Sequence, residues 1–279
     1  MKGIKMPDKE EKMSDLTAKE YVKGSSKKDF WNAYAPTFRK NPKRFGYEEK
    51  FMNLAQIEPG TTVFDMGCGP GTLAIPLAQQ GCQVWACDFS EKMLEILQRE
   101  AEEKGIADRI HTELMDWNED WEPHNIPVCD VAISSRSMMG PDLAEGVAKL
   151  QSKSKGRVIV VTFTVETPHY NVKVAEAIGH KKADKPAAQL LVNLLFDQGL
   201  KPKVDYIDSQ RIEYFDSYED SVRKMAEDFF RGDLTEEQKE KLREYNRNHL
   251  ITEEVKGETK YLYDAPWTVA WAFVDWNFK

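Results

Sequence analysis

The sequence predicts an α/β fold in which a doubly wound, mostly parallel seven-stranded sheet carries a helical cap. Short apolar runs alternate with helical patterns through the middle of the chain, as expected of strand-helix-strand units around a parallel sheet. The runs at 128–134 and 157–163 are nearly continuous in apolar residues, which is typical of strands covered on both faces. A glycine-rich turn lies where the first apolar run gives way to a helix.

Seven segments have the length and residue types of strands, and they are spaced so that a helix fits between most neighbours. The first follows a Pro59-Gly60 turn, and the aromatic last segment alternates as a strand that runs antiparallel, at or near the edge of the sheet. The expected strands are 61–66, 83–88, 109–114, 128–134, 157–163, 203–207 and 267–276.

The segments between these strands carry helical patterns. Ser90 is a suitable N-cap because its hydroxyl can accept a hydrogen bond from the first helical turn. Leu190, Leu191, Leu194 and Leu195 recur at helical spacing before Gly199, which can end a helix. The expected helices are 71–80, 90–105, 141–150 and 187–200.

Two segments fall outside this alternation. Residues 1–57 precede the sheet as an N-terminal helical segment, and the charged residues 211–263 interrupt it as a helical insertion. Ordinary crossovers do not need so long an excursion, so we assign both segments to a cap over the open end of the strands. The core then comprises 58–210, completed by the final strand in 264–279. The alternative, that both segments are merely peripheral helices, stays open.

Composition limits the class of protein. No window approaches the roughly 18 uninterrupted apolar residues of a membrane span, and the N-terminus lacks an apolar signal region. We therefore expect a cytoplasmic protein with no membrane segment. The four cysteines include no C-x-x-C pair and no histidines at zinc-finger spacing, so we expect reduced thiols and no metal.

The charge balance disfavours nucleic acid as a partner. The formal net charge is -8, whereas nucleic-acid binding depends on Lys and Arg side chains that neutralise phosphates. Residues 23–44 nevertheless hold seven basic side chains against one acid. This segment is either a solvated surface or an anion site.

The turn after the first strand carries glycines at alternate positions. It reads DMGCGPG from Asp65 to Gly71. Glycines let the backbone approach a ligand, and the following helix offers unpaired N–H groups. A dinucleotide-binding motif would read G-x-G-x-x-G, whereas here the spacing is G-x-G-x-G with an acid two residues before the first glycine. This spacing disfavours an NAD-dependent dehydrogenase.

The turn resembles the first motif of the class I S-adenosylmethionine-dependent methyltransferases, which have a Rossmann-like fold. The resemblance covers roughly residues 30–208 and the last strand. It implies that the turn lies against the methionine part of S-adenosylmethionine and that Asp65 helps to orient its ammonium group, directly or through water. The turn residues assigned to the cofactor are Gly67, Cys68, Gly69 and Gly71.

A second acid lies at the end of the second strand. Asp88 comes twenty-one residues after Gly67, where an acid can accept hydrogen bonds from both ribose hydroxyls. The segment that follows resembles the second motif of the same family. The resemblance implies that Phe89 and Met93 flank the adenine ring.

Two more segments at the ends of strands complete the expected cofactor site. By resemblance to the family, Asp116 would bind the adenine amino group with Trp117 supporting the ring; a surface acid beside a core tryptophan is the alternative. Ser134 and Ser135 follow the fourth strand, where the family lines its reaction centre, so either could reach the cofactor.

Candidate catalytic groups lie in two further segments. Tyr34 belongs to an aromatic segment that resembles the pre-sheet segment of small-molecule methyltransferases, and it could close over the cofactor carboxylate or the reaction centre; plain packing of a cap helix is the alternative. A general base is needed only if the acceptor arrives protonated. His169, which follows the fifth strand, is the first candidate for that base and Glu166 the second.

These patterns predict an S-adenosylmethionine-dependent methyltransferase that acts on a small-molecule acceptor. The sequence has no N-P-P-Y or D-P-P-Y quartet and no Pro-Cys nucleophile placed for cytosine chemistry, which disfavours nucleic acid. An RNA or protein methyltransferase that docks its substrate on residues 23–44, and a non-catalytic protein that binds S-adenosylmethionine, remain open. The acceptor atom and the oligomeric state are not predicted.

Overall fold

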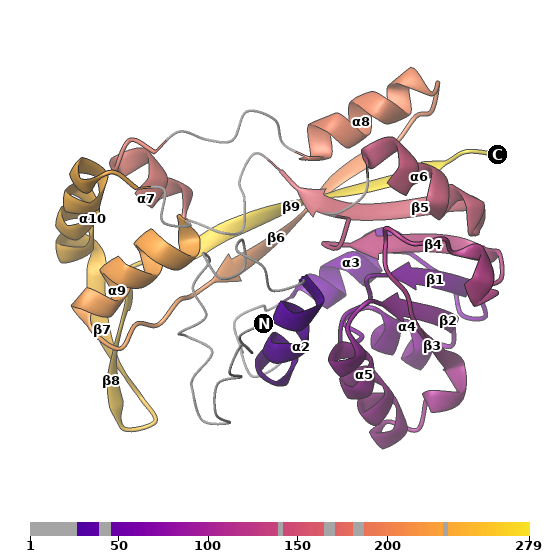
Figure 1. Cartoon of the computed structure of the whole chain (residues 1–279), viewed down its shortest axis with the longest axis horizontal. Coiled ribbons are helices and arrows are strands. Elements are labelled where there is room, and N and C mark those ends of the chain that lie inside the picture. The colour runs from indigo at the N-terminus through magenta and orange to yellow at the C-terminus, as the bar shows by residue number, and fades with distance from the viewer. Residues whose placement is uncertain (1–26, 39–45, 139–141, 165–170, 181–186, 231–233) are drawn as a thin grey trace, which may run out of the picture.

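A computed structural model describes residues 27–38, 46–138, 142–164, 171–180, 187–230 and 234–279. Its centre is a seven-stranded sheet in the order β3-β2-β1-β4-β5-β9-β6 (Figure 1). The strands are β1 (Thr62–Met66), β2 (Gln83–Asp88), β3 (Ile110–Leu114), β4 (Cys129–Ser135), β5 (Ser154–Phe163), β6 (Lys203–Arg211) and β9 (Trp267–Asn277).

The sheet is parallel from β3 to β5, and β9 runs antiparallel to both of its neighbours. The doubly wound, mostly parallel seven-stranded prediction is therefore confirmed, including the antiparallel last strand. β9 lies one strand in from the edge, because it pairs with β6 over the whole length of β6. β6 itself forms the edge of the sheet.

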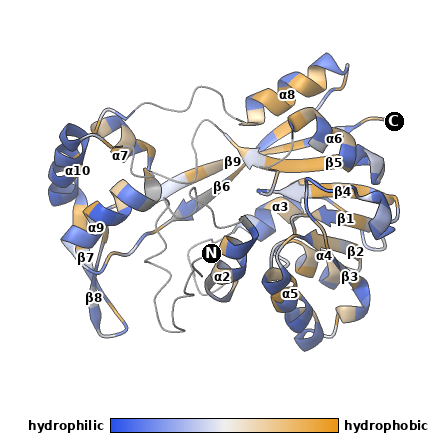
Figure 2. Cartoon of the chain, in the orientation of Figure 1, coloured by the Kyte–Doolittle hydropathy of each residue, from blue (hydrophilic) through white to orange (hydrophobic). Residues whose placement is uncertain are grey.

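Helices cover both faces of the sheet, and the alternation along β1 shows how. Val63 belongs to the core on the side of α3, α4 and α5, whereas Phe64 belongs to the core on the side of α6 and α8. Figure 2 shows the apolar strands between helices, of which α5 is largely hydrophilic and α8 largely hydrophobic. The helices are α2 (Lys27–Phe38), α3 (Tyr47–Ala55), α4 (Ala74–Gln80), α5 (Glu91–Glu103), α6 (Leu143–Ser152), α7 (Val172–Ala177), α8 (Ala187–Asp197), α9 (Tyr218–Lys224) and α10 (Glu236–His249).

The helix expected at 71–80 begins only at Ala74. Gly71 has a φ of 84°, a left-handed conformation that a right-handed helix does not allow, so the chain continues as a turn for three more residues. The helix expected from Ser90 is confirmed as α5. The Ser90 side chain accepts a hydrogen bond from the Met93 N–H and caps it.

The insertion between β6 and β9 is not wholly helical, so this part of the prediction was wrong. α9 continues into a π-helical turn at Met225–Phe229, and α10 follows, but residues after α10 form a two-stranded hairpin. Its strands are β7 (Leu250–Val255) and β8 (Glu258–Tyr263), joined by Lys256 and Gly257. Both joining residues have positive φ, as a tight two-residue hairpin turn requires.

The insertion lies beyond the carboxyl ends of the parallel strands, where β6 and β9 extend past the rest of the sheet (Figure 1). α10 contacts α7 and α9 there. None of the helices in the described part of the chain combines the length and the apolarity needed to cross a bilayer.

Candidate active site

The polar residues singled out in the sequence meet at the carboxyl ends of β1, β2 and β4. Asp65 lies near the end of β1, Asp88 ends β2, and Ser134 lies near the end of β4. β1 is hydrogen-bonded to β2 on one side and to β4 on the other. Ligands of open α/β sheets bind in the crevice outside these strand ends, so the three residues mark the candidate site.

The glycine turn is tied to β2 through its backbone. The N–H groups of Gly67 and Cys68 both donate to the Cys87 carbonyl, at 2.7 and 3.0 Å. The Gly69 N–H donates to Oδ2 of Asp88 at 2.8 Å. The turn and the second acid are therefore one connected structure.

The three glycines of the turn serve different purposes. A Cβ atom on Gly67 would lie 2.2 Å from Cβ of Ser137, and one on Gly71 would lie 2.3 Å from a methyl group of Leu97. A Cβ on Gly69 would have nothing within 4 Å. Gly67 and Gly71 thus permit close packing of the protein on itself, whereas Gly69 faces open space in which a ligand can lie.

Asp65 is the most unusual group of the site. Its side chain is buried, and neither carboxylate oxygen has a hydrogen-bond partner within the described residues. Burial, with a smaller contribution from the charge of Asp88, raises its pKa to about 8. A buried acid without partners is destabilising. The arrangement is therefore suited to receiving a hydrogen-bond donor or a cation from a ligand.

Asp88 is equally buried but firmly held. Oδ1 accepts a hydrogen bond from the Ser90 N–H at 2.9 Å, and Oδ2 accepts the bond from Gly69. Burial raises its pKa to about 6, although the backbone hydrogen bonds act in the opposite direction. Each oxygen keeps a further lone pair, so the carboxylate can still accept hydrogen bonds from a bound molecule.

Helix α2 reaches this part of the site through Asn32, which the sequence analysis did not single out. Oδ1 of Asn32 accepts hydrogen bonds from the Ser90 hydroxyl at 2.6 Å and from the Lys92 N–H at 3.2 Å. Tyr34 lies on the same helix, half-buried, with its ring stacked on Phe30 at 5.9 Å between centroids. The helix of Tyr34 is therefore held next to the residues that follow β2.

The residues that are expected to contact the adenine ring, near Asp88, occupy different environments. Met93 is buried and Phe89 is half-buried. Asp116 is half-buried, and its Oδ1 accepts two hydrogen bonds from Asn118, both at 2.8 Å. Its charge contributes to the raised pKa of Asp88, which places the two acids in one electrostatic neighbourhood. Trp117 packs in the core, 5.2 Å from the ring of Trp121.

Serines after β4 connect that strand to the glycine turn. The hydroxyl groups of Ser134 and Ser137 lie 2.9 Å apart, and Ser137 donates to the Met66 carbonyl at 2.7 Å. Ser135 instead shares a hydrogen bond with the Tyr47 hydroxyl at 2.6 Å. Ser137 and Tyr47 were missed in the sequence because Met66, to which Ser137 donates, and Ser135, which is bonded to Tyr47, are far away from them along the chain.

The two candidate bases, His169 and Glu166, lie outside the described residues. The described residues also contain no group of three or more His, Cys, Asp or Glu side chains that could hold a metal ion. All four cysteines, Cys68 included, are buried free thiols.

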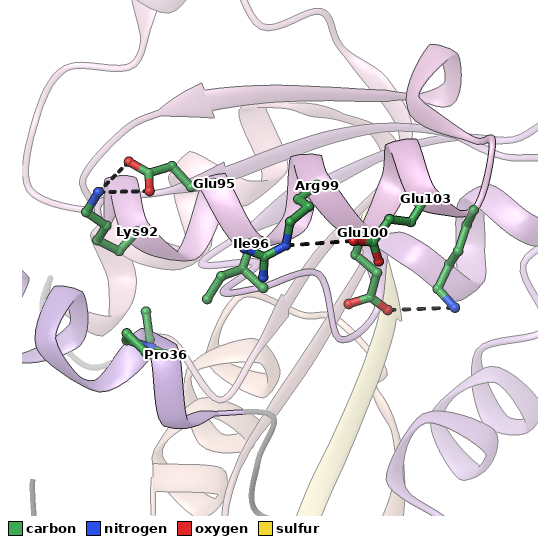
Figure 3. A pocket seen from close by; sticks show the side chains of 9 residues that line it. Pro36, Lys92, Glu95, Ile96, Arg99, Glu100 and Glu103 are labelled. Carbon is green, nitrogen blue, oxygen red and sulfur yellow. Dashed lines mark hydrogen bonds and ion pairs between the residues drawn. The ribbon is translucent and has the colours of Figure 1, made fainter. Parts of the chain in front are cut away.

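A separate groove of about 770 Å³ lies between α2 and the outer face of α5 (Figure 3). Its charged groups largely pair with one another, Lys92 with Glu95 at 2.7 Å and Lys104 with Glu100 at 3.8 Å. The groove contains none of the acids or glycines of the strand ends. We therefore do not regard it as the catalytic centre.

Known proteins resemble this chain both in sequence and in fold. Residues 63–155 match the family model described as a methyltransferase domain. An uncharacterized protein of Haemophilus influenzae is 31% identical over 234 residues, which cover 83% of this chain and 81% of that protein. A ubiquinone biosynthesis O-methyltransferase of Leptothrix cholodnii is 32% identical over 97 residues, 33% of this chain and 40% of that enzyme.

Two solved structures share the fold. The YcgJ protein of Bacillus subtilis superposes with a TM-score of 0.51 at 13% identity, covering 84% of this chain and 98% of that one. A Bacillus halodurans C-125 protein described as a candidate methyltransferase gives a TM-score of 0.50 at 17% identity, covering 82% and 97%. These two likenesses show the Rossmann-like fold. The span of the matched methyltransferase domain contains the glycine turn and both buried acids, and the chain belongs to the class I S-adenosylmethionine-dependent methyltransferases.

Proposed function

We propose that this enzyme transfers the methyl group of S-adenosylmethionine to a small-molecule acceptor bound at the carboxyl ends of the strands. The observation that carries the proposal is the buried carboxylate of Asp65, which has no hydrogen-bond partner in the described residues and belongs to the strand that leads into the glycine turn. S-adenosylmethionine carries an ammonium group that such an acid can bind. The acid and the turn thus fit this cofactor.

The proposed cofactor contacts follow the order of the strands. Asp65 orients the ammonium group, and the turn formed by Gly67, Cys68, Gly69 and Gly71 lies against the methionine part. Asp88 accepts hydrogen bonds from the ribose hydroxyls, because its two oxygens are fixed by backbone N–H groups and retain free lone pairs.

The adenine ring lies beyond Asp88 in this proposal. Phe89 and Met93 flank the ring, and Asp116 accepts a hydrogen bond from the amino group with Trp117 behind it. Ser134 lines the reaction centre from β4. The hydrogen bond from Ser134 to Ser137, and from there to Met66, would keep this wall in register with the turn.

The bound cofactor supplies a methyl group made electrophilic by its sulfonium. The protein has to hold the acceptor in line with that group and exclude water, and such positioning can be worth on the order of 7 to 11 kcal/mol of barrier. Tyr34 is proposed to close over the reaction centre from α2. His169, with Glu166 as second candidate, is proposed to take a proton from an acceptor that arrives protonated.

Two features support a small-molecule acceptor. Relatives that match part of the chain include enzymes named for ubiquinone biosynthesis, and the acidic net charge disfavours polyanions. A cytoplasmic location belongs to the same proposal. An RNA acceptor docked on residues 23–44 would instead give a salt-dependent complex with bulk tRNA. A protein acceptor docked there would become methylated. Cofactor binding without turnover across a broad acceptor screen would indicate a binding protein.

The cofactor site is tested by calorimetry with S-adenosylhomocysteine, the product form of the cofactor. Asp88→Ala should weaken binding by about 1 to 3 kcal/mol, since hydrogen bonds in a buried site are lost. The control is Asp197→Ala, which removes an exposed acid at the end of α8 and the same charge. Equal affinity in the two variants would refute the placement of the ribose.

A further inference from the structure

Arg136 is the first residue of the loop that leaves β4, immediately beside the candidate active site. Its N–H donates to the Val161 carbonyl of β5 at 2.8 Å. The next residue, Ser137, is bonded to the end of β1 through the Met66 carbonyl. The backbone of residue 136 is therefore fixed between the glycine turn and β5.

This backbone conformation is unfavourable for an arginine. The φ angle of Arg136 is 61°, in the left-handed region, which costs a residue with a side chain about 1 to 2 kcal/mol. Residues held in such conformations cluster at functional sites. The strain directs attention to what the side chain does.

The guanidinium group is oriented by two aromatic rings. Its central carbon lies 4.0 Å from the centre of the Tyr47 ring and 5.5 Å from that of Trp271. Both rings are buried, and the Tyr47 hydroxyl is held by Ser135. Stacking uses the flat face of a guanidinium and leaves the N–H groups on its edge available.

Arg157, on β5, is an arginine of this protein whose guanidinium is paired with a carboxylate. Its Nε and Nη2 donate to the two carboxylate oxygens of Asp275 at 3.1 and 2.8 Å. Around Arg136, by contrast, the described part of the chain places no carboxylate within ion-pair distance. Since Arg136 is only half-buried, its N–H edge can meet a ligand.

We propose that Arg136 binds an anionic group, a carboxylate or a phosphate, of the methyl acceptor and so restricts the enzyme to anionic acceptors. The inference rests on the proposed function, because it needs an acceptor at this end of the sheet. The planar fork of a guanidinium matches two oxygens of either group. Its fixed position between β4 and β5 would orient the acceptor toward the cofactor.

The first test uses protein saturated with S-adenosylhomocysteine and follows the guanidinium ¹⁵N–H signals by NMR. Benzoate and phenyl phosphate are titrated separately, with benzamide as the neutral match. We expect a saturable shift of the Arg136 signal with at least one anion and none with benzamide. A shift with benzoate indicates a carboxylate group on the acceptor, and a shift with phenyl phosphate indicates a phosphate group. Absence of a shift with both anions overturns the proposal.

Variants of Arg136 test whether anion binding depends on the planar guanidinium group or only on its positive charge. Arg136→Lys keeps the charge and should weaken anion binding at least about tenfold, the factor that corresponds to losing one charge-assisted hydrogen bond. Arg136→Gln should abolish it. The control is Arg247→Gln, an exposed arginine of α10 whose loss changes net charge equally. Equal weakening in the control would overturn the proposal.

A last comparison separates the acceptor from the cofactor, which has a carboxylate of its own. S-adenosylhomocysteine and 5′-methylthioadenosine differ in that the second lacks the amino-acid end. Arg136→Gln should leave the affinity for both unchanged. Weakening for S-adenosylhomocysteine alone would assign Arg136 to the cofactor and overturn the proposal. Failure of the wild type to bind S-adenosylhomocysteine would instead refute the proposed function.

Discussion

The two ends of the central strands carry carboxylates in opposite circumstances. At the amino end, Asp130 of β4 accepts hydrogen bonds from the backbone and hydroxyl of Thr62 and pairs with Lys155 at 2.8 Å. These contacts lower its pKa to about 2. At the carboxyl end, Asp65 of β1 has no such partner in the described residues, and burial raises its pKa to about 8.

The difference separates stability from function. The carboxylates of Asp130 and Asp275 at the amino end are satisfied within the protein, the second by its pair with Arg157. Polar groups at the carboxyl end are left with unused capacity, which lowers the stability of the ligand-free protein and is offset when a ligand binds. The buried carboxylate without a partner in the described residues therefore locates the site more sharply than the groove beside α5, in which the charges are mostly paired.

The largest expected effect is on the pH dependence of stability. The Asp65 pKa rises from 3.8 to about 8 on folding, so folding without ligand favours its protonated form. Its contribution is present in full below about 4 and is lost as the pH rises through about 8. Urea unfolding of ligand-free protein should give a falling free energy over this range, and Asp65→Asn should flatten the fall.

Two other acids, Asp88 and Asp130, also contribute to the pH dependence of stability. Asp88, with its pKa raised to about 6, should leave a smaller residual fall centred lower in pH. Asp130, with its pKa lowered from 3.8 to about 2, contributes stability that is lost only as the pH falls through about 2. A wild-type profile that stays flat or rises over the range in which Asp65 titrates would contradict the environment assigned to it.

The second effect is on cofactor affinity and should occur at one end of the strands only. Asp65→Asn should weaken binding of S-adenosylhomocysteine about 10- to 100-fold, because it removes a charged partner of the ammonium group. Asp130→Asn, the same change at the amino end, should cost about 1 kcal/mol of unfolding free energy and leave that affinity unchanged. Similar affinities in both variants, measured by calorimetry, would contradict the assignment of cofactor binding to the carboxyl ends of the strands.

Glycines of the turn offer a third comparison at closer range. Gly71→Ala should lower the unfolding free energy by about 1 to 3 kcal/mol, because its new methyl group would overlap Leu97 in the core. Gly69→Ala meets no protein atom but occupies the ligand side of the turn. It should reduce affinity for S-adenosylhomocysteine more than stability. Denaturant unfolding and calorimetry measure the two losses in both variants. A larger loss of stability in Gly69→Ala than in Gly71→Ala, with a larger loss of affinity in Gly71→Ala, would contradict these roles.

The parallel part of the fold was predictable because its signals are local. Apolar runs, the Ser90 cap and the glycine turn each act over a few residues, and Asp65 and Asp88 could be placed from their positions at the ends of strands. The helix beginning at Ala74 was misplaced by the left-handed Gly71. The hairpin at 250–263 was missed although Lys256-Gly257 between β-rich segments is a turn signal, because the charged surroundings resembled a helix.

Contacts between distant segments could not be predicted in this way. The position of β9 between β5 and β6 depends on pairing with a strand more than fifty residues earlier. Arg136 became a candidate only when the structure brought Tyr47 and Trp271 to it from α3 and β9. Nothing adjacent to Arg136 in the sequence indicates that its guanidinium stacks on these two rings or that its backbone is left-handed.

The smallest expected effect concerns the attachment of α2 at the carboxyl end. Asn32→Ala removes three hydrogen bonds to the start of α5, those with Ser90, Glu91 and Lys92. Asn32 is half-buried and Ser90 can still cap the helix, so global stability should fall by about 1 kcal/mol or less. The local effect should be larger, because α2 contacts α5 whereas α3 is packed into the core. Hydrogen exchange should therefore accelerate in α2 and stay unchanged in α3, with Asn248→Ala, an exposed position on α10, as control. If α2 amides kept wild-type protection, the attachment of α2 to α5 would depend on the ion pair of Lys28 with Glu91 and on apolar packing, which includes the buried Ala35, and not on Asn32.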